Sequence, residues 1–395
     1  MKILTFTSLF PNSARPELGV FIRQRVQHVA QLPDTSVEVI APVPYCPSWL
    51  AGKHWRIYRG IPQRETAENL AVWHPRYAFL PKISMPLHGA LMFLGALNTG
   101  RRLHRRFTFD FIDAHYVYPD GFAAVLLGKI LKIPVVISAR GTDINVFPSF
   151  ALIRPLIRWT LQQAKGLVAV SSALKDQMVL LGAAPDKIRV IPNGVDMERF
   201  EPMDRSEARR SLGIPITGAV IVSVGSLVPA KRHELLIEAV AQLAKQVPEL
   251  KAYIIGDGPL RSELEALRRS THTEERVFLL GERPNTELYR WFSAADVSCL
   301  VSAREGWPNV VMESLACGTP MVATRVGGIP EIIVSSDLGT LVAENLHSIA
   351  HGIASALERK WDREILVRYA RSRTWEVVAT EVEQYLSSLT KVCPP

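Results

Sequence analysis

The chain has 395 residues, of which 48% are hydrophobic and 21% are charged, and its formal net charge is +8. This composition is that of a globular protein, and the length predicts two domains of about 200 residues each rather than one core. No run of eighteen apolar residues occurs, so no transmembrane helix is expected. The first residues are better interpreted as a buried strand than as a signal peptide.

The charge distribution indicates a class of partner, and the cysteines indicate a compartment. Residues 1–195 hold 23 Lys and Arg against 11 Asp and Glu, whereas the rest of the chain holds 23 against 27. This predicts that the first half meets an anionic partner. No nucleic-acid-binding motif is present, so an anionic membrane face or a phosphate-bearing lipid is the preferred interpretation. The cysteines show no pairing or metal-ligand spacing, which favours a reducing cytosol; they are Cys46, Cys299, Cys317 and Cys393.

Short apolar runs alternate with helical patterns along the whole chain. In the first half the predicted strands are 2–7, 37–43, 70–75, 109–115, 133–139, 166–171 and 188–193, and helical patterns separate most of them, for example 18–31, 120–132 and 172–181. In the second half the predicted strands are 219–225, 251–258, 276–282, 297–302, 320–326 and 339–342. This alternation predicts an α/β protein with two parallel sheets, each covered on both faces.

The domain boundary is predicted at 194–212, where the sequence becomes polar and rich in breaks. The N-terminal domain would span 1–195 and the C-terminal domain 196–374. Residues 375–391 are expected to form a final amphipathic helix with no strand after it. Ligands of parallel sheets bind at the carboxyl ends of the strands, so the loops that follow the strands should contain the site.

Three strand exits of the first half carry candidate residues. Gly19 lies just inside the start of a helix, but its loop is not GxGxxG, which weighs against a dinucleotide oxidoreductase. A glycine approached by a ligand phosphate and an ordinary loop glycine are equally good interpretations. His115 directly follows a strand, which favours a functional histidine, and Asp120 is expected to cap the next helix. Arg140, Thr142 and Asp143 share the next exit, either as site residues or with Thr142 or Asp143 as a simple helix cap.

The second half has a similar exit after 219–225. Gly225 and Ser226 leave the strand and lead to Lys231 and Arg232 at the start of a helix. A lysine at a helix N-terminus opposes the helix dipole unless an anion lies between them. A phosphate contact is therefore the preferred interpretation of Lys231, over a solvated side chain.

The most informative stretch is 305–320, EGWPNVVMESLACGTP, which lies between two apolar strands. Pro308 suits the first turn of a helix, and the free amides and positive dipole end of that helix would form a seat for an anion. Asn309 and Glu313 are four residues apart and share one face of the helix, while Glu305 lies in the loop ahead of it. An anion seat flanked by two carboxylates suits a sugar nucleotide, which carries both phosphates and hydroxyls.

This block, together with 191–200, 224–232, 256–260 and 326–332, resembles glycosyltransferase family 4, the retaining sugar-nucleotide-dependent transferases of GT-B fold. The resemblance covers nearly the whole chain. It implies two Rossmann-like domains whose parallel sheets face each other across a cleft, with the nucleotide held mainly by the second domain and the last helix crossing back onto the first. The implied function is transfer of a sugar from a nucleoside diphosphate sugar to a glycan or lipid-linked acceptor, in bacterial cell-surface polysaccharide or glycolipid synthesis.

The resemblance also implies roles for individual residues. Glu313 would hydrogen-bond the ribose hydroxyls, Glu305 would face the donor sugar, and Lys231 would neutralise the diphosphate. His115 would contact the transferred sugar, and Gly19 would lie against the phosphates. The diphosphate would also be held by three backbone amides, those of Asn309, Val310 and Val311.

Acceptor-side residues and departures from the family pattern follow. Asp143 would orient donor or acceptor hydroxyls. Ser226, and Gly225 before it, occupy the phosphate loop, but the position of Ser226 is often Arg in the family, and Arg232 is a candidate substitute for that charge. Arg140 replaces the usual His ahead of Gly-Ser/Thr-Asp, a change expected to affect acceptor choice.

No metal is expected, because no cluster of residues in the sequence requires one. The resemblance implies that the departing phosphate takes the acceptor's proton on the same face, which explains why no pair of carboxylates at glycosidase spacing is obvious. Asp110 and Asp113 lack the spacing of a DxD metal motif and are assigned to a strand. An epimerase or a phosphorylase of related fold fits 305–320 poorly. A catalytically decayed sugar-nucleotide-binding or scaffold protein is the alternative, and the joint presence of His115, Lys231 and the two glutamates argues against it.

Residues 86–107 combine an apolar stretch with a basic end. As a helix, this segment would either lie on an anionic membrane or be a core helix with an exposed basic tail, and the two interpretations are equally supported. The first would place a cytoplasmic protein peripherally on the inner face of the cell membrane.

Overall fold

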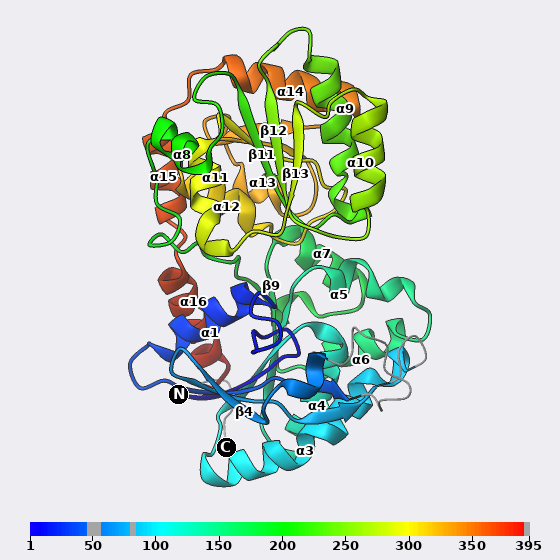
Figure 1. Ribbon diagram of the computed structural model, residues 1–395. Helices are drawn as coiled ribbons and strands as arrows, with labels where there is room; N and C mark the ends of the chain where they lie inside the picture. Colours follow the sequence, from blue (N-terminus) through cyan, green and yellow to red (C-terminus); the bar gives the residue numbers. More distant parts are fainter. Residues whose placement is uncertain (46–56, 80–83, 391–395) are drawn as a thin grey trace. The chain divides into compact units, whose positions relative to one another are not determined.

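The computed structural model describes residues 1–45, 57–79 and 84–390 (Figure 1). The chain divides into two compact units: Met1–Asn193 together with Trp375–Pro395 form the first, and Gly194–Thr374 form the second. Each unit has its own largely parallel sheet, so the predicted α/β class with two such sheets is confirmed. Cys46 and Cys393 lie outside the described residues.

The first unit is built on an eight-stranded sheet in the order β10-β9-β8-β7-β1-β2-β5-β4. Its strands are β1 (Lys2–Phe6), β2 (Ser36–Ile40), β4 (Arg64–Ala67), β5 (Leu70–Trp73), β7 (Phe111–His115), β8 (Val135–Ala139), β9 (Gly166–Ala169) and β10 (Ile188–Val190). All neighbours are parallel except β4, which pairs antiparallel with β5. A separate parallel pair joins β3 (Val43–Tyr45) to β6 (Arg76–Ala78).

The antiparallel edge strand β4 is not predicted by the sequence pattern, because its residues, RETA, are polar and none is fully buried. The turn between β4 and β5 consists of Glu68 and Asn69, which have φ values of 47° and 70°. Two residues with positive φ form the hairpin turn whose twist matches that of the flanking strands. This edge of the sheet therefore ends in a hairpin rather than in a further βαβ unit.

The helices of the first unit are α1 (Val20–Ala30), α3 (His88–Arg106), α4 (Phe122–Leu131), α5 (Thr142–Asn145), α6 (Arg154–Gln163), α7 (Ser172–Leu180) and α16 (Trp375–Thr390). Although α16 is remote in sequence, it packs beside α1 (Figure 1). Its buried side chains recur every three or four residues, as expected of one helix face; they include Trp375, Val378, Val382 and Leu386. This face joins the core cluster that contains Phe111 of β7.

The second unit has a six-stranded sheet in the order β13-β12-β11-β14-β15-β16, parallel throughout. Its strands are β11 (Val220–Val224), β12 (Lys251–Ile255), β13 (Val277–Gly281), β14 (Val297–Leu300), β15 (Met321–Thr324) and β16 (Gly339–Val342). Its helices are α8 (Arg205–Leu212), α9 (His233–Leu243), α10 (Arg261–Ser270), α11 (Leu288–Ala294), α12 (Asn309–Ala316), α13 (Ile329–Ile332), α14 (Leu346–Glu358) and α15 (Arg363–Arg371).

Two hydrophobic clusters cover the two faces of this sheet. Val220 and Val222 of β11 belong to one cluster, and Ile221 between them belongs to the other. Because side chains alternate along a strand, each strand of a sheet that is covered on both sides must be apolar throughout. This accounts for the continuous apolar runs of the second half of the sequence.

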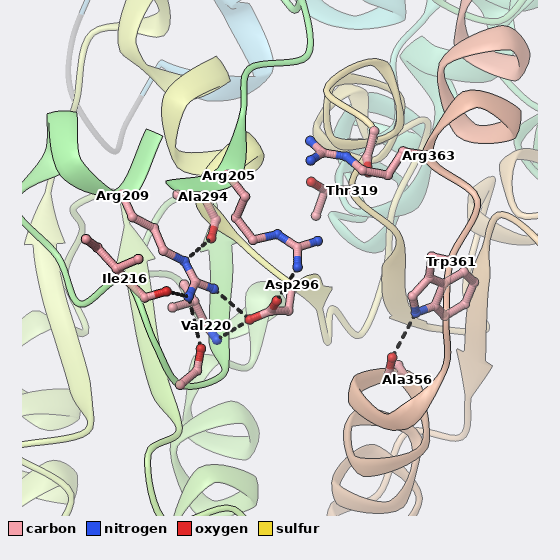
Figure 2. A network of polar contacts seen from close by, with 12 residues as sticks. Arg205, Arg209, Ile216, Val220, Ala294, Asp296, Thr319, Ala356, Trp361 and Arg363 are labelled. Carbon is pink, nitrogen blue, oxygen red and sulfur yellow. Dashed lines mark hydrogen bonds and ion pairs between the residues drawn. The ribbon is translucent and has the colours of Figure 1, made fainter. Parts of the chain in front are cut away.

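A buried polar network fixes the amino ends of β11 and β14 (Figure 2). The carboxylate of Asp296 accepts hydrogen bonds from Val220 N at 2.7 Å, Arg209 Nη2 at 2.8 Å and Arg205 Nη1 at 2.7 Å. Arg209 also donates to three backbone carbonyls, which satisfies a guanidinium that is almost wholly buried. The network ties α8 to the sheet edge opposite the carboxyl ends of the strands, so we assign it a structural role.

Candidate active site

The best candidate site of the second unit lies at the carboxyl ends of β11 and β14, which are neighbours in the sheet. Lys231 Nζ and Glu305 Oε1 are 2.5 Å apart. Ser302 Oγ donates to the same carboxylate oxygen at 2.6 Å. Two residues that the sequence places at separate strand exits are therefore in direct contact.

Backbone contacts hold the loops that carry this pair. Lys231 ends a short 3-10 helix, Pro229–Lys231, and Ala303 N donates to Ala230 O at 2.8 Å. Gly327 has a φ of 51°, and a Cβ atom there would lie 1.8 Å from the carbonyl oxygen of Glu305. Only glycine allows this close approach. The loop after β15 is therefore closed tightly over the backbone of Glu305.

The helix α12 begins at Asn309, and Pro308 precedes it with φ −77° and ψ 105°. The prediction that Pro308 lies in the first helical turn is wrong, because its backbone is extended. The amide of Val311 donates to Pro308 O at 3.1 Å, so a turn already uses one of the three amides expected at the diphosphate. This disfavours Val311 as a contact of the diphosphate.

Glu313 lies one turn further along α12 than Asn309. Desolvation raises the pKa of its carboxyl group to about 7, with Arg199 acting in the opposite direction and Asp196 in the same direction. Among the described residues, the carboxylate of Glu313 has no hydrogen-bond or ion-pair partner, although the charge of Arg199 acts on it, and the residue is partly open to solvent. A desolvated carboxyl group without a partner is suited to accept hydrogen bonds from ligand hydroxyls.

The remaining candidates of this unit are less well placed for a phosphate. Arg232 Nη1 lies 2.8 Å from Glu344 Oε2, so its charge is already compensated. This pairing disfavours Arg232 as the substitute for an arginine at Ser226. Ser226 itself is exposed, and its carbonyl accepts a hydrogen bond from Val228 N at 2.9 Å. Gly225 packs against the side chain of Lys231, where a Cβ atom would lie 3.4 Å from Lys231 Cε.

The first unit buries a chain of polar side chains at the carboxyl ends of β7 and β8, which are also neighbours. His115 is fully buried; its Nε2 lies 3.2 Å from Asp113 Oδ2, and its Nδ1 accepts a hydrogen bond from Arg140 Nη2. A guanidinium can only donate, so the ring is neutral and carries its proton on Nε2. Burial lowers the pKa of His115 to about 4. The expected contact of His115 with a sugar stays a prediction.

Asp113 is held in turn by Arg25, a fully buried residue of α1. Arg25 Nη2 lies 3.6 Å from Asp113 Oδ1, and Arg25 Nη1 donates to Ser138 Oγ at 2.9 Å. Desolvation would raise the pKa of Asp113, but Arg25 and His115 outweigh it and lower this pKa to about 2. The assignment of Asp113 to a strand is confirmed, since β7 contains it, but its buried ion pair with Arg25 was not predicted.

Asp143 is fully buried, and its carboxylate is bonded to backbone amides. Its carboxylate accepts hydrogen bonds from the amides of Arg140 at 3.0 Å, Gly141 at 2.8 Å and Val117 at 2.8 Å. Burial raises the pKa of Asp143, although these amides oppose the shift. The prediction that Asp143 caps this helix is wrong, because Gly141 is the N-cap of α5 and Asp143 is its second residue. Its carboxylate instead fixes the backbone of the loops before the helix.

Two further candidates have structural explanations. Gly19 has a φ of 65°, and a Cβ atom there would lie 2.1 Å from Leu9 O, so the chain's own backbone requires glycine at this position. The prediction that Asp120 caps the following helix is wrong: α4 starts at Phe122, and the carboxylate of Asp120 accepts a hydrogen bond from Ser8 N. Burial raises the pKa of Asp120 to about 7.

Tyr116, which follows His115, was not singled out by the sequence reasoning. It has a φ of 83°, an unfavourable conformation for a residue with a side chain, and its ring packs edge-on against Phe147 at a centroid distance of 6.0 Å. Strained residues cluster at functional sites. Nothing in the sequence marks this residue, because the strain follows from the turn after β7.

The segment 86–107 contains the helix α3. Its buried residues recur at helical spacing, and they are Gly89, Met92, Ala96, Gly100 and Leu103. The opposite face carries Leu87 and Leu94, which are 60% and 61% exposed, followed by four exposed arginines, Arg101, Arg102, Arg105 and Arg106. One face of this helix therefore belongs to the core, and the other is apolar at one end and basic at the other.

The described residues contain neither a membrane-spanning helix nor a cluster of metal ligands. Within 1–45, 57–79 and 84–390, no helix is both long enough and apolar enough to span a membrane. In the same part of the chain, no group of three or more His, Cys, Asp or Glu side chains is arranged to hold a metal ion.

Comparison with protein families matches both halves of the chain. The family described as "Glycosyltransferase Family 4" matches residues 57–199, and that described as "Glycosyl transferases group 1" matches residues 204–373. TuaC of Bacillus subtilis (strain 168), a glycosyltransferase named for teichuronic acid biosynthesis, is 31% identical over 84% of this chain and 83% of its own. The D-inositol 3-phosphate glycosyltransferase of Corynebacterium glutamicum (strain R) is 31% identical over 80% of this chain and 81% of its own.

Solved structures share the fold. The sucrose-phosphate synthase of Thermosynechococcus elongatus has a TM-score of 0.78 at 18% identity, covering 99% of both chains. Anabaena Alr3699/HepE in complex with UDP-glucose has a TM-score of 0.68 at 20% identity, covering 99% of this chain and 98% of its own. At these identities the likeness concerns the fold alone.

Proposed function

The chain belongs to glycosyltransferase family 4 and has the GT-B fold, and from this premise we propose that it is a retaining enzyme using a nucleoside diphosphate sugar. The acceptor would be a glycan or a lipid-linked sugar of bacterial cell-surface polysaccharide or glycolipid synthesis. The main observation behind this proposal is the ion pair between Lys231 and Glu305 at the carboxyl edge of the second sheet. Glu305 lies four residues before the start of α12.

Lys231 would stabilise the leaving diphosphate. Without a ligand, its charge is compensated by Glu305 at 2.5 Å. A bound diphosphate would compete for the ammonium, and the negative charge that grows on the leaving group would meet a cation already in position. The amides of Asn309 and Val310 would add fixed donors at the start of α12. Glu305 would then face the donor sugar, and Glu313 the ribose hydroxyls.

Retention of configuration requires attack on the face that the diphosphate leaves. The bond from the anomeric carbon to the diphosphate oxygen breaks, the bond to the acceptor oxygen forms, and the acceptor proton passes to the departing phosphate oxygen. No side-chain base is needed for this transfer. We expect no metal requirement, because Lys231 and the amides supply the positive charge; turnover lost in EDTA and restored by Mn²⁺ would contradict this expectation.

A donor panel tests the proposal. UDP-, GDP- and ADP-sugars are incubated with the full chain, and nucleoside diphosphate release is measured without added acceptor. Slow hydrolysis of one donor is expected, and it would name the nucleotide. UDP-glucose is the first choice, because the structure of HepE holds it. If no donor is hydrolysed or bound, the nucleotide-sugar assignment fails, and a decayed site becomes the better description.

A further inference from the structure

Arg140 differs from the other charged groups of the first unit in the side chains that its guanidinium contacts. Its Nη1 donates to Asn193 Oδ1 at 2.8 Å, its Nη2 donates to His115 Nδ1, and its guanidinium lies 5.5 Å from the ring centroid of Phe21. Its Nε is buried and has no hydrogen-bond partner. Both side-chain acceptors are uncharged. Among the described residues, no carboxylate lies within ion-pair distance of this guanidinium.

The neighbouring carboxylates direct their oxygens elsewhere. Asp113 faces Arg25 and His115. Both oxygens of Asp143 are taken by three backbone amides, and the Asp120 carboxylate is bonded to a backbone amide of the β1 exit. Asp113 and Asp143 therefore stabilise the charge of Arg140 only across space, and the guanidinium lacks the directly bonded carboxylate that buried cations normally find.

The place of Arg140 in the fold is that of a ligand contact. It follows β8 directly, at the carboxyl edge where parallel sheets bind ligands, and it is partly open to solvent. The next residue but one, Thr142, is exposed. A guanidinium offers planar, paired donors that match a carboxylate or a phosphate.

We propose that Arg140 is a specificity residue that binds a negatively charged group, a carboxylate or a phosphate, carried by the acceptor. This inference rests on the proposed function, since it requires an acceptor. An anionic group would supply the missing counter-charge and an acceptor for the buried Nε donor. Because Arg140 also holds His115, the bound anion and the end of β7 would be linked through one side chain.

The test compares acceptors that differ only in charge. With the donor found in the panel, transfer to inositol 3-phosphate is measured against inositol, and transfer to malate against malamide. The variants are Arg140→Gln, which removes the charge but keeps an amide donor on a shorter side chain, and Arg140→Lys, which keeps the charge. Arg189→Gln, an exposed arginine of β10, is the matched control for charge loss in the same unit.

We expect Arg140→Gln to lower kcat/KM for the charged acceptor by about 10- to 100-fold more than for the uncharged counterpart, because any loss through His115 affects both acceptors equally. Arg140→Lys should recover part of this loss, and Arg189→Gln should behave like the parent chain. Equal losses for charged and uncharged acceptors would show a purely structural role and overturn the proposal. A loss of donor hydrolysis without acceptor would assign the anion to the donor and overturn it too.

A binding experiment separates this proposal from the proposed function. Inorganic phosphate is titrated into the parent chain and Arg140→Gln at constant ionic strength, and the shift of the thermal unfolding midpoint is measured. The parent should show the tighter phosphate site even if no donor is ever hydrolysed. If the two proteins respond identically, Arg140 does not bind anions, whatever the outcome of the donor panel.

Discussion

Lys231 and Glu305 come from loops 74 residues apart in sequence, yet their charged atoms lie 2.5 Å from each other. The pair is partly buried, with side-chain exposures of 21% and 11%. An ion pair in this setting holds both side chains in place before a ligand arrives. A diphosphate would then exchange one anionic partner of Lys231 for another, which avoids leaving a desolvated cation without compensation.

Lys231→Ala should lower kcat by about 100-fold, with a smaller effect on donor KM, because the lysine acts mainly on charge that develops as the diphosphate leaves. Initial rates over a range of donor concentrations measure both constants. Lys245→Ala, an exposed lysine of the same unit, is the control. If Lys231→Ala turns over at the parental rate, its assignment as leaving-group stabiliser is wrong.

Glu313→Ala should raise donor KM by about 10- to 100-fold, since a hydrogen bond to a charged group contributes about 1.5–3 kcal/mol. Equilibrium binding of the nucleoside diphosphate gives an independent check. Unchanged affinity for the nucleotide, with or without its sugar, would remove Glu313 from the ribose site.

The same carboxyl group should make donor binding depend on pH. Its pKa is raised to about 7, so it is largely protonated at pH 6 and largely ionised at pH 8. Ribose hydroxyls donate to the ionised form, so kcat/KM for the donor should rise as pH increases through about 7. His115 and His233, whose pKa values burial lowers to about 4, do not titrate in this window. Glu313→Gln should flatten the profile, and a parental profile in that variant would assign the titration elsewhere.

The sequence predicted the positions of the buried strands along the chain better than it predicted the contacts of the site. Apolar runs marked the buried parallel strands, because a strand that is covered on both faces must be apolar at nearly every position. The polar strand β4 gave no such signal. A glycine in a motif does not by itself indicate a ligand: the positive φ of Gly19 and the nearby carbonyl of Leu9 explain this glycine without one.

The buried cluster around His115 was largely beyond sequence reasoning. Arg25 lies on α1, far from β7 in sequence, and an arginine in a helical pattern is normally assigned to the exposed face. Only the packing of α1 on the sheet brings it to Asp113. The pairing of Arg232 with Glu344 likewise depends on the tertiary fold. It compensates the charge that the sequence analysis had considered available for a phosphate.

Arg25→Met should destabilise the first unit by about 3–5 kcal/mol at neutral pH, because it leaves Asp113 buried without its cation. Hydrogen exchange of β7 amides measures the change. Arg23→Met is the matched control on α1, since Arg23 pairs with the more exposed Glu68 at 3.5 Å and such pairs contribute at most about 1 kcal/mol. The pKa of Asp113 is lowered to about 2, so its stabilising contribution is present above about pH 4 and lost as pH falls towards 2. The deficit of the variant should shrink over that range; a deficit independent of pH would exclude the ion pair as its cause.

The outward face of α3 is proposed to bind an anionic membrane surface. Leu87 and Leu94 are exposed, and the four arginines that follow have no carboxylate partner among the described residues. Buried apolar area and attraction to acidic headgroups would act together. The full chain should sediment with vesicles of phosphatidylglycerol and phosphatidylcholine but not with phosphatidylcholine alone. Salt should weaken the binding.

The charge requirement of this membrane binding is tested by Arg101→Gln combined with Arg105→Gln, which should reduce binding about 30-fold at constant lipid, given about 1 kcal/mol for each basic residue near the surface. The control is Arg158→Gln combined with Arg189→Gln, which removes the same charge from exposed positions of the same unit. Leu94→Ser separates apolar insertion from simple charge attraction, because it leaves every arginine in place. Equal sedimentation with neutral and anionic vesicles, or equal loss in the two arginine pairs, would mean that α3 is a core helix with a solvated basic end.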